Sequence, residues 1–306
     1  MTLAAVLPNT AKAEAPPVLL PYQQAWIADD AQLKVAEKSR RIGLTWAEAA
    51  DDVLIAAEAG GQNVYYIGYN QDMAIEYVEA CGMWARAYNY VASEIVEGLW
   101  EEEKDDRHIK TYTIRFPGSG RRIVALSSRP ANLRGKQGVM VIDEAAFHDN
   151  LGELLKAALA MLIWGGRVRV ISTHDSVTNA FNELIQQIKG KKRKGSVFRC
   201  DFKTAVAQGL YKRVCLRLGK EWTAEEEAAW VADVYEFYGD DAEEELDVVP
   251  SQSAGAYLPG VLIEARMRPV PIVRLSKTDA FGEYPEPFRR AEIAGWCDEV
   301  LLPLLQ

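Results

Sequence analysis

The chain has 306 residues, of which 49% are hydrophobic and 26% charged, a composition typical of a folded globular protein rather than a disordered one. Its length suits one large domain, or one domain with an appendage, and excludes a peptide hormone or a disulfide-stapled miniprotein. The longest purely apolar stretch, Ala157–Trp164, is far shorter than the roughly 20 residues that a membrane-spanning helix needs. A net charge of -9 disfavours a nucleic-acid partner except at local basic stretches such as residues 189–199.

The N-terminal segment and the cysteines indicate the compartment. Residues 1–20 lack the basic and continuous apolar regions of a secretory signal, so we expect a flexible tail there. The four cysteines form no CxxC pair, which favours a reducing compartment and argues against a structural zinc site. We therefore expect a cytoplasmic protein without a membrane partner.

From about residue 32 the sequence alternates β-rich runs with helix-period segments. The expected strands are 33–37, 63–68, 111–116, 121–127, 138–142, 167–172 and 196–200, and the expected helices are 45–59, 71–91, 151–162 and 179–188. The Pro-Gly-Ser-Gly turn after Phe116 should join two strands as a hairpin. The alternation predicts an α/β fold, with a mainly parallel sheet, helices on both faces and active loops at the carboxyl ends of the strands.

After residue 200 the β-rich runs fade. We expect a core over residues 21–200 and a smaller, mostly helical C-terminal subdomain over 201–306. Within that subdomain, Thr223 should cap a helix that Gly239 ends.

The segment Glu37-Lys-Ser-Arg-Arg-Ile-Gly-Leu-Thr-Trp46 lies between an expected strand and an expected helix. A phosphate-binding P-loop follows the pattern G-x-x-x-x-G-K-[ST], in which backbone amides hold the phosphates, the lysine reaches the β and γ oxygens, and the hydroxyl holds Mg²⁺. Gly43 and Thr45 match that pattern, but Leu44 stands at the lysine position. Lys38, at the other end of the loop, can supply the missing charge. The alternative is a basic strand end that precedes a helix by chance.

A second segment, Gly138-Val-Met-Val-Ile-Asp-Glu-Ala-Ala146, places Asp143 and Glu144 at the tip of a buried strand. In P-loop ATPases the first carboxylate coordinates Mg²⁺ and the second polarises the attacking water. An Asp-Glu pair after a strand can also be a simple helix cap. Its position after a P-loop-like segment in the same α/β pattern favours ATP and Mg²⁺ as ligands.

Two weaker signals agree with this interpretation. The strand Arg167-Val-Arg-Val-Ile-Ser-Thr-His174 ends in hydroxyls where translocating ATPases sense the γ-phosphate, although Ser172 and Thr173 can equally cap a helix. Upstream, Leu20-Pro-Tyr-Gln-Gln-Ala-Trp26 offers an amide to the adenine edge, although its aromatic residues can equally be core.

The order of these segments resembles the ATPase domain of phage large terminase subunits, especially the Mu-like branch, in which the P-loop lysine often stands at the start of the loop. The resemblance extends to Ser128-Arg-Pro-Ala-Asn-Leu-Arg-Gly135 and to the acidic segment 238–247, and it covers about residues 20–260. It implies a RecA/ASCE-like P-loop ATPase that hydrolyses ATP to drive double-stranded DNA into a preformed capsid in the host cytoplasm. The implied partners are the portal protein and the small terminase subunit, with a ring of subunits formed only on the portal.

The resemblance also implies roles for individual residues. Gln23 would contact adenine, Lys38 and Arg41 the phosphates, and Thr45 and Asp143 the Mg²⁺ ion. Glu144 would be catalytic, and Arg134 would be a charge-stabilising or DNA-facing arginine. The complete expected nucleotide-binding set is Gln23, Lys38, Ser39, Arg40, Arg41, Ile42, Gly43, Leu44, Thr45 and Trp46. The expected coupling set is Ser172, Thr173 and His174.

One departure from the family pattern concerns the C-terminal part. Large terminases normally continue into an RNase H-like nuclease that holds two metals with clustered carboxylates. After Pro250 the acidic residues are scattered, so we expect no nuclease domain in this chain.

Two other functions stay open. A helicase-like DNA-remodelling ATPase shares these motifs but needs a second RecA-like domain. A nonhydrolysing nucleotide-binding scaffold would follow if Leu44 at the lysine position abolished catalysis. DNA-stimulated ATP hydrolysis by the intact chain distinguishes the alternatives.

Overall fold

The computed structural model describes residues 18–88, 96–101, 108–126, 133, 135–252, 265–267 and 273–305. The chain divides into two compact units, residues 1–254 and residues 255–306. The first unit contains the sheet and all the expected motif segments.

Eight strands form one sheet in the order β3-β4-β5-β2-β6-β7-β1-β8. Their bounds are β1 (Leu33–Lys38), β2 (Val64–Ile67), β3 (Val96–Glu101), β4 (His108–Phe116), β5 (Arg121–Leu126), β6 (Val139–Asp143), β7 (Arg167–Ser172) and β8 (Ser196–Cys200). The neighbours from β5 through to β8 pair in parallel, whereas β4 pairs antiparallel with both β3 and β5. The expected hairpin after Phe116 is confirmed, since the Gly120 amide donates to the Phe116 carbonyl at 2.9 Å. Because β7 lies between β1 and β6, one strand separates the ends that carry Lys38 and Asp143.

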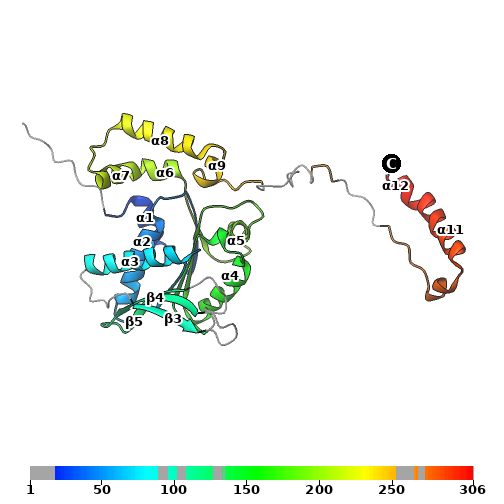
Figure 1. Cartoon of the computed structure of the whole chain (residues 1–306), viewed down its shortest axis with the longest axis horizontal. Helices are drawn as coiled ribbons and strands as arrows, with labels where there is room; N and C mark the ends of the chain where they lie inside the picture. Colours follow the sequence, from blue (N-terminus) through cyan, green and yellow to red (C-terminus); the bar gives the residue numbers. More distant parts are fainter. Residues whose placement is uncertain are drawn as a thin grey trace, which may run out of the picture. The chain divides into compact units, whose positions relative to one another are not determined.

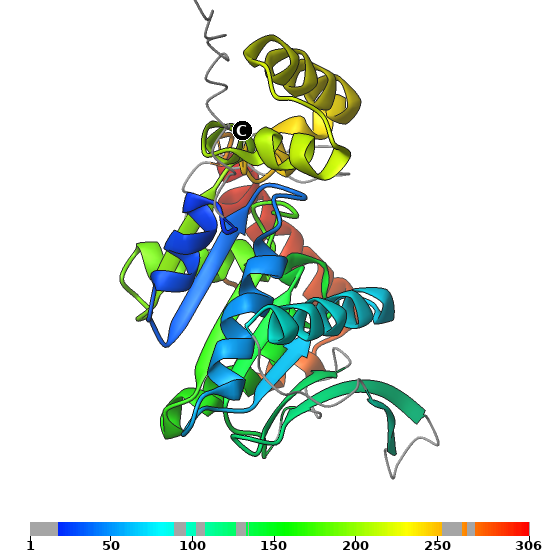
Figure 2. The same ribbon diagram turned by 90° about the vertical axis from the view of Figure 1, so that its left-hand side faces the viewer.

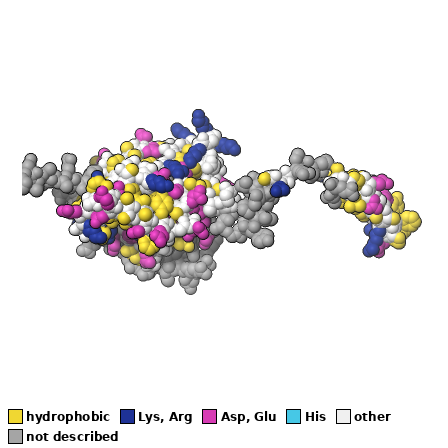
Figure 3. Space-filling view, turned by 90° about the horizontal axis from the view of Figure 1, so that it is seen from above, with side chains coloured by type: hydrophobic (Ala, Val, Ile, Leu, Met, Phe, Trp, Pro, Cys, Tyr) yellow, Lys and Arg dark blue, Asp and Glu magenta, His cyan; other side chains and the backbone are white. Residues whose placement is uncertain are grey.

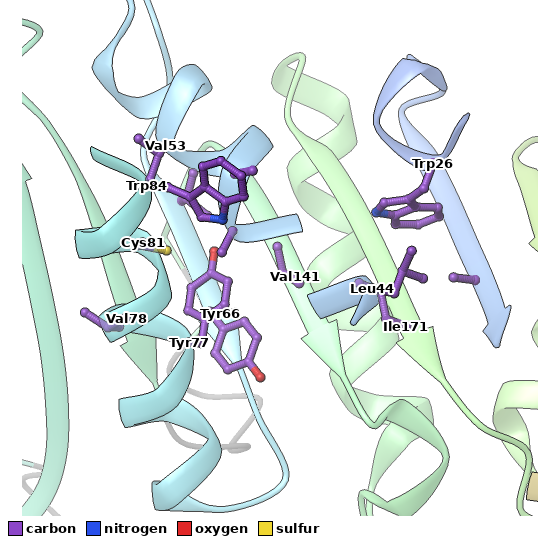
Figure 4. Packing of buried hydrophobic residues seen from close by; sticks show 14 of the residues in the cluster. Trp26, Leu44, Val53, Tyr66, Tyr77, Val78, Cys81, Trp84, Val141 and Ile171 are labelled. Carbon is purple, nitrogen blue, oxygen red and sulfur yellow. The ribbon is translucent and has the colours of Figure 1, made fainter. Parts of the chain in front are cut away.

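Helices cover both faces of this sheet (Figures 1 and 2). One face carries α1 (Pro21–Ala28), α2 (Leu44–Ala57) and α3 (Gln71–Ala87), and the other carries α4 (Leu151–Leu159) and α5 (Ala180–Lys189), with the 3-10 turns η2 (Ala145–Phe147) and η3 (Ala160–Trp164). Successive residues of the central strands point to opposite faces. Val141 and Ile171 therefore join the core beneath α1–α3 (Figure 4), and Met140 and Val170 join the core beneath α4 and α5. The expected fold class is confirmed.

The helices after β8 pack at the carboxyl end of the sheet (Figure 1). They are α6 (Phe202–Ala207), α7 (Leu210–Leu218), α8 (Ala224–Tyr238), the turn η4 (Gly239–Asp241) and α9 (Ala242–Glu245). The expected ends of α8 are confirmed, because the Thr223 side chain accepts a hydrogen bond from the Glu226 amide at 3.1 Å and Gly239 ends the helix with a φ of 51°.

The division of the chain differs from the boundary expected near residue 200. Phe202 and Leu246 are buried in the same core as α1–α3, and the Phe202 amide donates to the Leu246 carbonyl at 2.9 Å. The helices over residues 202–245 therefore belong to the unit that contains the sheet, and the division falls after residue 254.

The second unit contains η5 (Asp279–Glu283), α11 (Glu286–Trp296), the π-helical turn η6 (Cys297–Leu301) and α12 (Leu302–Leu305). Within α11, Arg290 and Glu286 form an exposed ion pair at 2.7 Å. Across the residues with described structure, no helix is long and apolar enough to cross a membrane.

A buried ionic cluster fixes α2 to the sheet. The guanidinium of Arg169, on β7, contacts Glu48 at 2.6 Å, Asp52 at 2.8 Å and Asp51 at 2.7 Å, all on α2. Burial opposes the charged form of Arg169, but these carboxylates outweigh it and hold the pKa of Arg169 above its usual value. The cluster thereby sets the position of α2, the helix that follows the expected phosphate loop.

Candidate functional site

The loop from Lys38 to Gly43 joins β1 to α2 through two left-handed residues. Arg41 has a φ of 56° and Gly43 a φ of 74°. A non-glycine residue in this region is uncommon and is often found at functional sites. The Tyr22 hydroxyl donates to the Ile42 carbonyl at 2.5 Å, which holds the middle of the loop. Leu44, at the usual lysine position, is buried in the core (Figure 4), so that position serves packing instead of phosphate binding.

Gln23 ties α1 to the same loop. Its side-chain oxygen accepts from the Leu20 amide at 2.9 Å, and its nitrogen donates to the Gly43 carbonyl at 2.8 Å. One N–H of the Gln23 amide remains for another acceptor. The residue expected to contact adenine thus also braces the end of the phosphate loop.

Asp143, at the end of β6, is fully buried and held by three donors. Its Oδ2 accepts from the Thr45 hydroxyl at 2.8 Å and from the Tyr66 hydroxyl at 2.9 Å, and its Oδ1 accepts from the Glu144 amide at 3.0 Å. Burial, and after it the Glu144 carboxylate, raise the pKa of Asp143 to about 6, while Lys38 and the two hydroxyls oppose the rise. The hydroxyl of the phosphate loop and the first carboxylate of the Asp-Glu pair therefore meet directly.

Glu144 follows in a left-handed conformation, with a φ of 46°. Its Oε1 lies 3.0 Å from the ammonium of Lys38, a residue only 5% exposed. Its Oε2 is buried and has no hydrogen-bond partner among the described residues. Such an orphaned atom in a native structure points to a missing ligand or water. The structure thus brings Lys38 beside the expected catalytic carboxylate.

Residues at the end of β7 and just after it contact the segments next to both neighbouring strand ends. The Ser172 hydroxyl accepts from the amide of Ala146, two residues after Glu144, at 3.0 Å. His174 Nε2 lies 3.2 Å from an oxygen of Glu37, the residue before Lys38. The hydroxyl of Thr173 is buried and lacks a partner in the described structure. The expected coupling set therefore lies between the strand of Lys38 and the strand of Asp143.

Glu37 is itself buried and contacts the side chains of His174 and Lys189. Burial alone would raise its pKa, but hydrogen bonds from His174 and Lys189 outweigh burial and hold the pKa of Glu37 below its usual value. The Lys189 ammonium lies 2.6 Å from the carboxylate. The end of β1 is thus held from the α5 side of the sheet.

A contact that the sequence does not predict joins the phosphate loop to α9. The Arg40 guanidinium pairs with Glu245 at 2.6 Å, and the Arg40 amide donates to the Glu245 carbonyl at 2.9 Å. Ser39 donates its amide to the Cys200 carbonyl at 2.8 Å. Burial, opposed by Arg40, raises the pKa of Glu245. In the sequence, the acidic residues around position 245 look like a solvent-exposed helix face. The one signal of another role was that they lie in segment 238–247, which is part of the resemblance to large terminases.

The remaining expected residues are placed as follows. Arg41 is exposed and has no hydrogen-bond partner among the described residues. Trp46 is half-buried with its ring 4.5 Å from that of Trp84, which indicates packing. Arg134 lies outside the described residues. Tyr66 was not expected at the site, because the apolar run Val64–Ile67 looks like any buried strand.

The strand order and the strand-end residues define a class of protein. A parallel sheet whose phosphate-loop strand and Asp-Glu strand flank one further strand is the core of a P-loop ATPase. The chain belongs to the large terminase family: residues 35–245 match the family described as terminase large subunit, T4likevirus-type, N-terminal. The resemblance inferred from the motif order is confirmed.

Two relatives agree with this assignment, and a solved structure shares the fold. The chain is 47% identical over 299 residues to the probable terminase large subunit gp28 of Escherichia phage Mu, and 49% identical over 295 residues to the Mu-like prophage FluMu protein gp28 of Haemophilus influenzae. Each match covers 94% of this chain, but only 54% and 58% of those relatives, so the chain spans somewhat more than half their length. A mutant large terminase ATPase domain of Thermus phage P74-26 shares the fold, with 16% identity, a TM-score of 0.50, and coverage of 75% of this chain and 93% of that one.

Proposed function

We propose that this chain is the ATPase part of a large terminase and couples ATP hydrolysis to the movement of double-stranded DNA into a capsid. The observation that carries the proposal is the convergence of Lys38, Asp143 and Glu144 at the end of the parallel sheet, in a chain of the large terminase family. Such a cation and carboxylate pair is what phosphoryl transfer requires, since its catalysis depends on positioning and charge stabilisation.

The side chains at this edge fit Mg²⁺ and ATP. Mg²⁺ takes oxygen ligands, and the Thr45 hydroxyl and Asp143 carboxylate lie 2.8 Å apart. The buried, unpartnered oxygens of Glu144 and Thr173, as found in the described residues, suit a site that a polar ligand completes. When bound, Mg²⁺ would neutralise charge on the phosphates.

We assign the remaining roles to this chain's own side chains. Lys38 leaves Glu144 and contacts the phosphates together with Arg41, and Glu144 then orients the attacking water and accepts its proton. Gln23 offers its remaining N–H to adenine, and Arg134 supplies a further positive charge. Ser172, Thr173 and His174 couple the site to movement, because Ser172 contacts Ala146, two residues after Glu144, and His174 contacts Glu37, the residue before Lys38.

The partners proposed for the assembled motor follow from the family. They are double-stranded DNA, the portal protein and the small terminase subunit, in the host cytoplasm, with a ring of subunits formed on the portal. Several weak DNA contacts in such a ring would act together through their high effective concentration.

ATP hydrolysis by the 306-residue chain, with and without duplex DNA, tests the proposal. We expect DNA-stimulated turnover in the wild type and none in Lys38→Ala, with the circular dichroism spectrum unchanged. Lys156→Ala is the matched control, because Lys156 is exposed on α4 and makes only a 3.9 Å contact with Glu153. Normal turnover by Lys38→Ala would refute the assignment of Lys38. Nucleotide binding without any wild-type turnover would indicate a nonhydrolysing scaffold instead.

A further inference from the structure

Two hydroxyls from different elements converge on one oxygen of Asp143. Thr45, from α2, and Tyr66, from β2, both donate to Oδ2, while among the described residues the Glu144 amide is the one donor to Oδ1. A carboxylate oxygen has about two acceptor positions. Oδ2 is therefore saturated, and the remaining acceptor position of Asp143 lies on Oδ1.

The ring of Tyr66 is fixed from two sides. It stacks on the ring of Tyr77, from α3, with centroids 3.8 Å apart and planes 8° from parallel (Figure 4). The Tyr77 hydroxyl in turn donates to Asp52, a member of the Arg169 cluster, at 2.6 Å. Gly68 packs on the ring edge so closely that a Cβ there would lie 3.0 Å from Tyr66 Cε1. The Tyr66 hydroxyl thus has one stable position.

Packing alone does not account for a tyrosine here. Tyr66 is fully buried, and its hydroxyl has Asp143 as its partner. Burying a hydroxyl is unfavourable unless it is hydrogen-bonded, and phenylalanine would supply the same ring without that requirement. The hydroxyl therefore serves the carboxylate rather than the core.

We propose that Tyr66 is a positioning residue for Mg²⁺ binding, an inference that rests on the nucleotide-binding function proposed above. By holding Oδ2, Tyr66 fixes the side-chain rotation of Asp143 and leaves Oδ1 to face the ion or its bound water. Because the Thr45 hydroxyl donates its hydrogen bond to Oδ2, the lone pairs of the Thr45 oxygen stay available to the ion. Outer hydrogen bonds of this kind typically change metal affinity 10- to 100-fold.

The test is equilibrium binding of a fluorescent ATP analogue to the intact chain, titrated with Mg²⁺ and repeated in EDTA. For Tyr66→Phe we expect unchanged binding in EDTA and about a tenfold higher Mg²⁺ concentration for half-maximal enhancement. Tyr65→Phe is the matched control, because Tyr65 is the preceding residue of β2 and packs in the opposite core. It should retain the wild-type Mg²⁺ dependence.

A double-mutant cycle separates positioning from packing. In an Asp143→Asn background, Tyr66→Phe should add little to the Mg²⁺ requirement, because Tyr66 acts through that carboxylate. Wild-type Mg²⁺ dependence in Tyr66→Phe, an additive effect in the double mutant, or a Tyr66→Phe chain that fails to fold would each overturn the proposal. A wild-type chain that binds no nucleotide would instead refute the proposed function.

Discussion

Lys38 and Glu144 form an ion pair, with the ammonium 3.0 Å from the carboxylate. Lys38 is buried, so its charge needs a partner at all times. If Lys38 contacts phosphate as proposed, a phosphate group has to compete with Glu144 for the ammonium, and binding would free the carboxylate for the attacking water. Under the proposed roles, binding and activation would be linked through the same ammonium group.

We predict different effects for the two neighbouring carboxylates. Glu144→Gln should bind Mg·ATP at least as tightly as the wild type, because Lys38 is released, but should hydrolyse it at least ~100-fold more slowly through loss of the general base. Asp143→Asn should weaken the Mg²⁺-dependent part of binding. Nucleotide titrations and single-turnover hydrolysis measure the two effects. Identical binding by both variants would contradict this division of roles.

The Glu37–Lys189 contact predicts a pH-dependent contribution to stability. The pKa of Glu37 is lowered in the folded chain, so its contribution is complete above the ordinary value of 4.5 and is lost as the pH falls through the folded-state pKa. Lys189→Met should lower the free energy of unfolding at pH 7 by about 1 kcal/mol. The difference should shrink at about pH 4, as denaturant titrations at the two pH values would show. A difference independent of pH would count against the ion pair.

The sequence predicted part of this site and missed another part for a physical reason. Carboxyl ends of parallel strands meet at one edge of a sheet, so Lys38, Asp143 and Ser172 could be placed together from the strand pattern alone. Tyr66 contributes through a neighbouring strand and Glu245 through a helix far along the chain. Such contacts depend on packing that no local pattern encodes.

The residue just before β6 is a glycine that cannot be replaced without displacing its neighbours. Gly138 has a φ of 143°, and a Cβ there would lie 2.1 Å from the Asn63 carbonyl oxygen. That carbonyl accepts the Val139 amide at 2.9 Å and so starts the pairing of β6 with β2. The position of Asp143 at the far end of β6 depends on this start.

We expect Gly138→Ala to lower the free energy of unfolding by about 2 kcal/mol or more, because both the backbone conformation and the space exclude a side chain. Gly152→Ala is the matched control, since Gly152 lies in α4 with open space around it. That change should be neutral or slightly stabilising. Denaturant unfolding of both variants measures their free energies of unfolding. Equal values would contradict the prediction and show that the start of β6 tolerates a side chain at position 138.

Among the strands, β3 is the one that the sequence pattern missed. It lies at the edge of the sheet and pairs only with β4, and its sequence, VEGLWE, breaks the apolar alternation with glycine and carboxylates. Edge strands often carry such residues. Helix α3 was expected to reach Val91 but ends at Ala87, and residues 89–95 lie outside the described structure. Central strands were predicted well because burial on both faces demands continuous apolar runs.

The charge of the molecule bears on the proposed contact with DNA. The face shown in Figure 3 mixes hydrophobic and acidic side chains, with a group of basic side chains along its upper margin and others scattered elsewhere. The net charge of -9 opposes a polyanion. In the described residues, no group of three or more His, Cys, Asp or Glu side chains is placed to hold a metal ion.

We therefore predict weak duplex binding by the isolated chain, with affinity that falls steeply as salt is added, and no Mn²⁺-dependent plasmid cleavage. Affinity should improve when several subunits are brought together on a ring-shaped scaffold. Fluorescence anisotropy at increasing salt and a plasmid nicking assay test both statements. Tight, salt-insensitive binding by the monomer, or cleavage by residues 1–306, would contradict this picture.

The contacts of Arg40 with Glu245 have a consequence for synthesis of the chain on the ribosome. The two residues are 205 positions apart, yet both the backbone and the side chain of Arg40 are held by Glu245. At ordinary translation rates of roughly 5–20 residues per second, about 10 to 40 s separate their emergence. During that interval the nascent loop lacks its contacts with Glu245, so the candidate site is completed late, after the whole sheet has been translated.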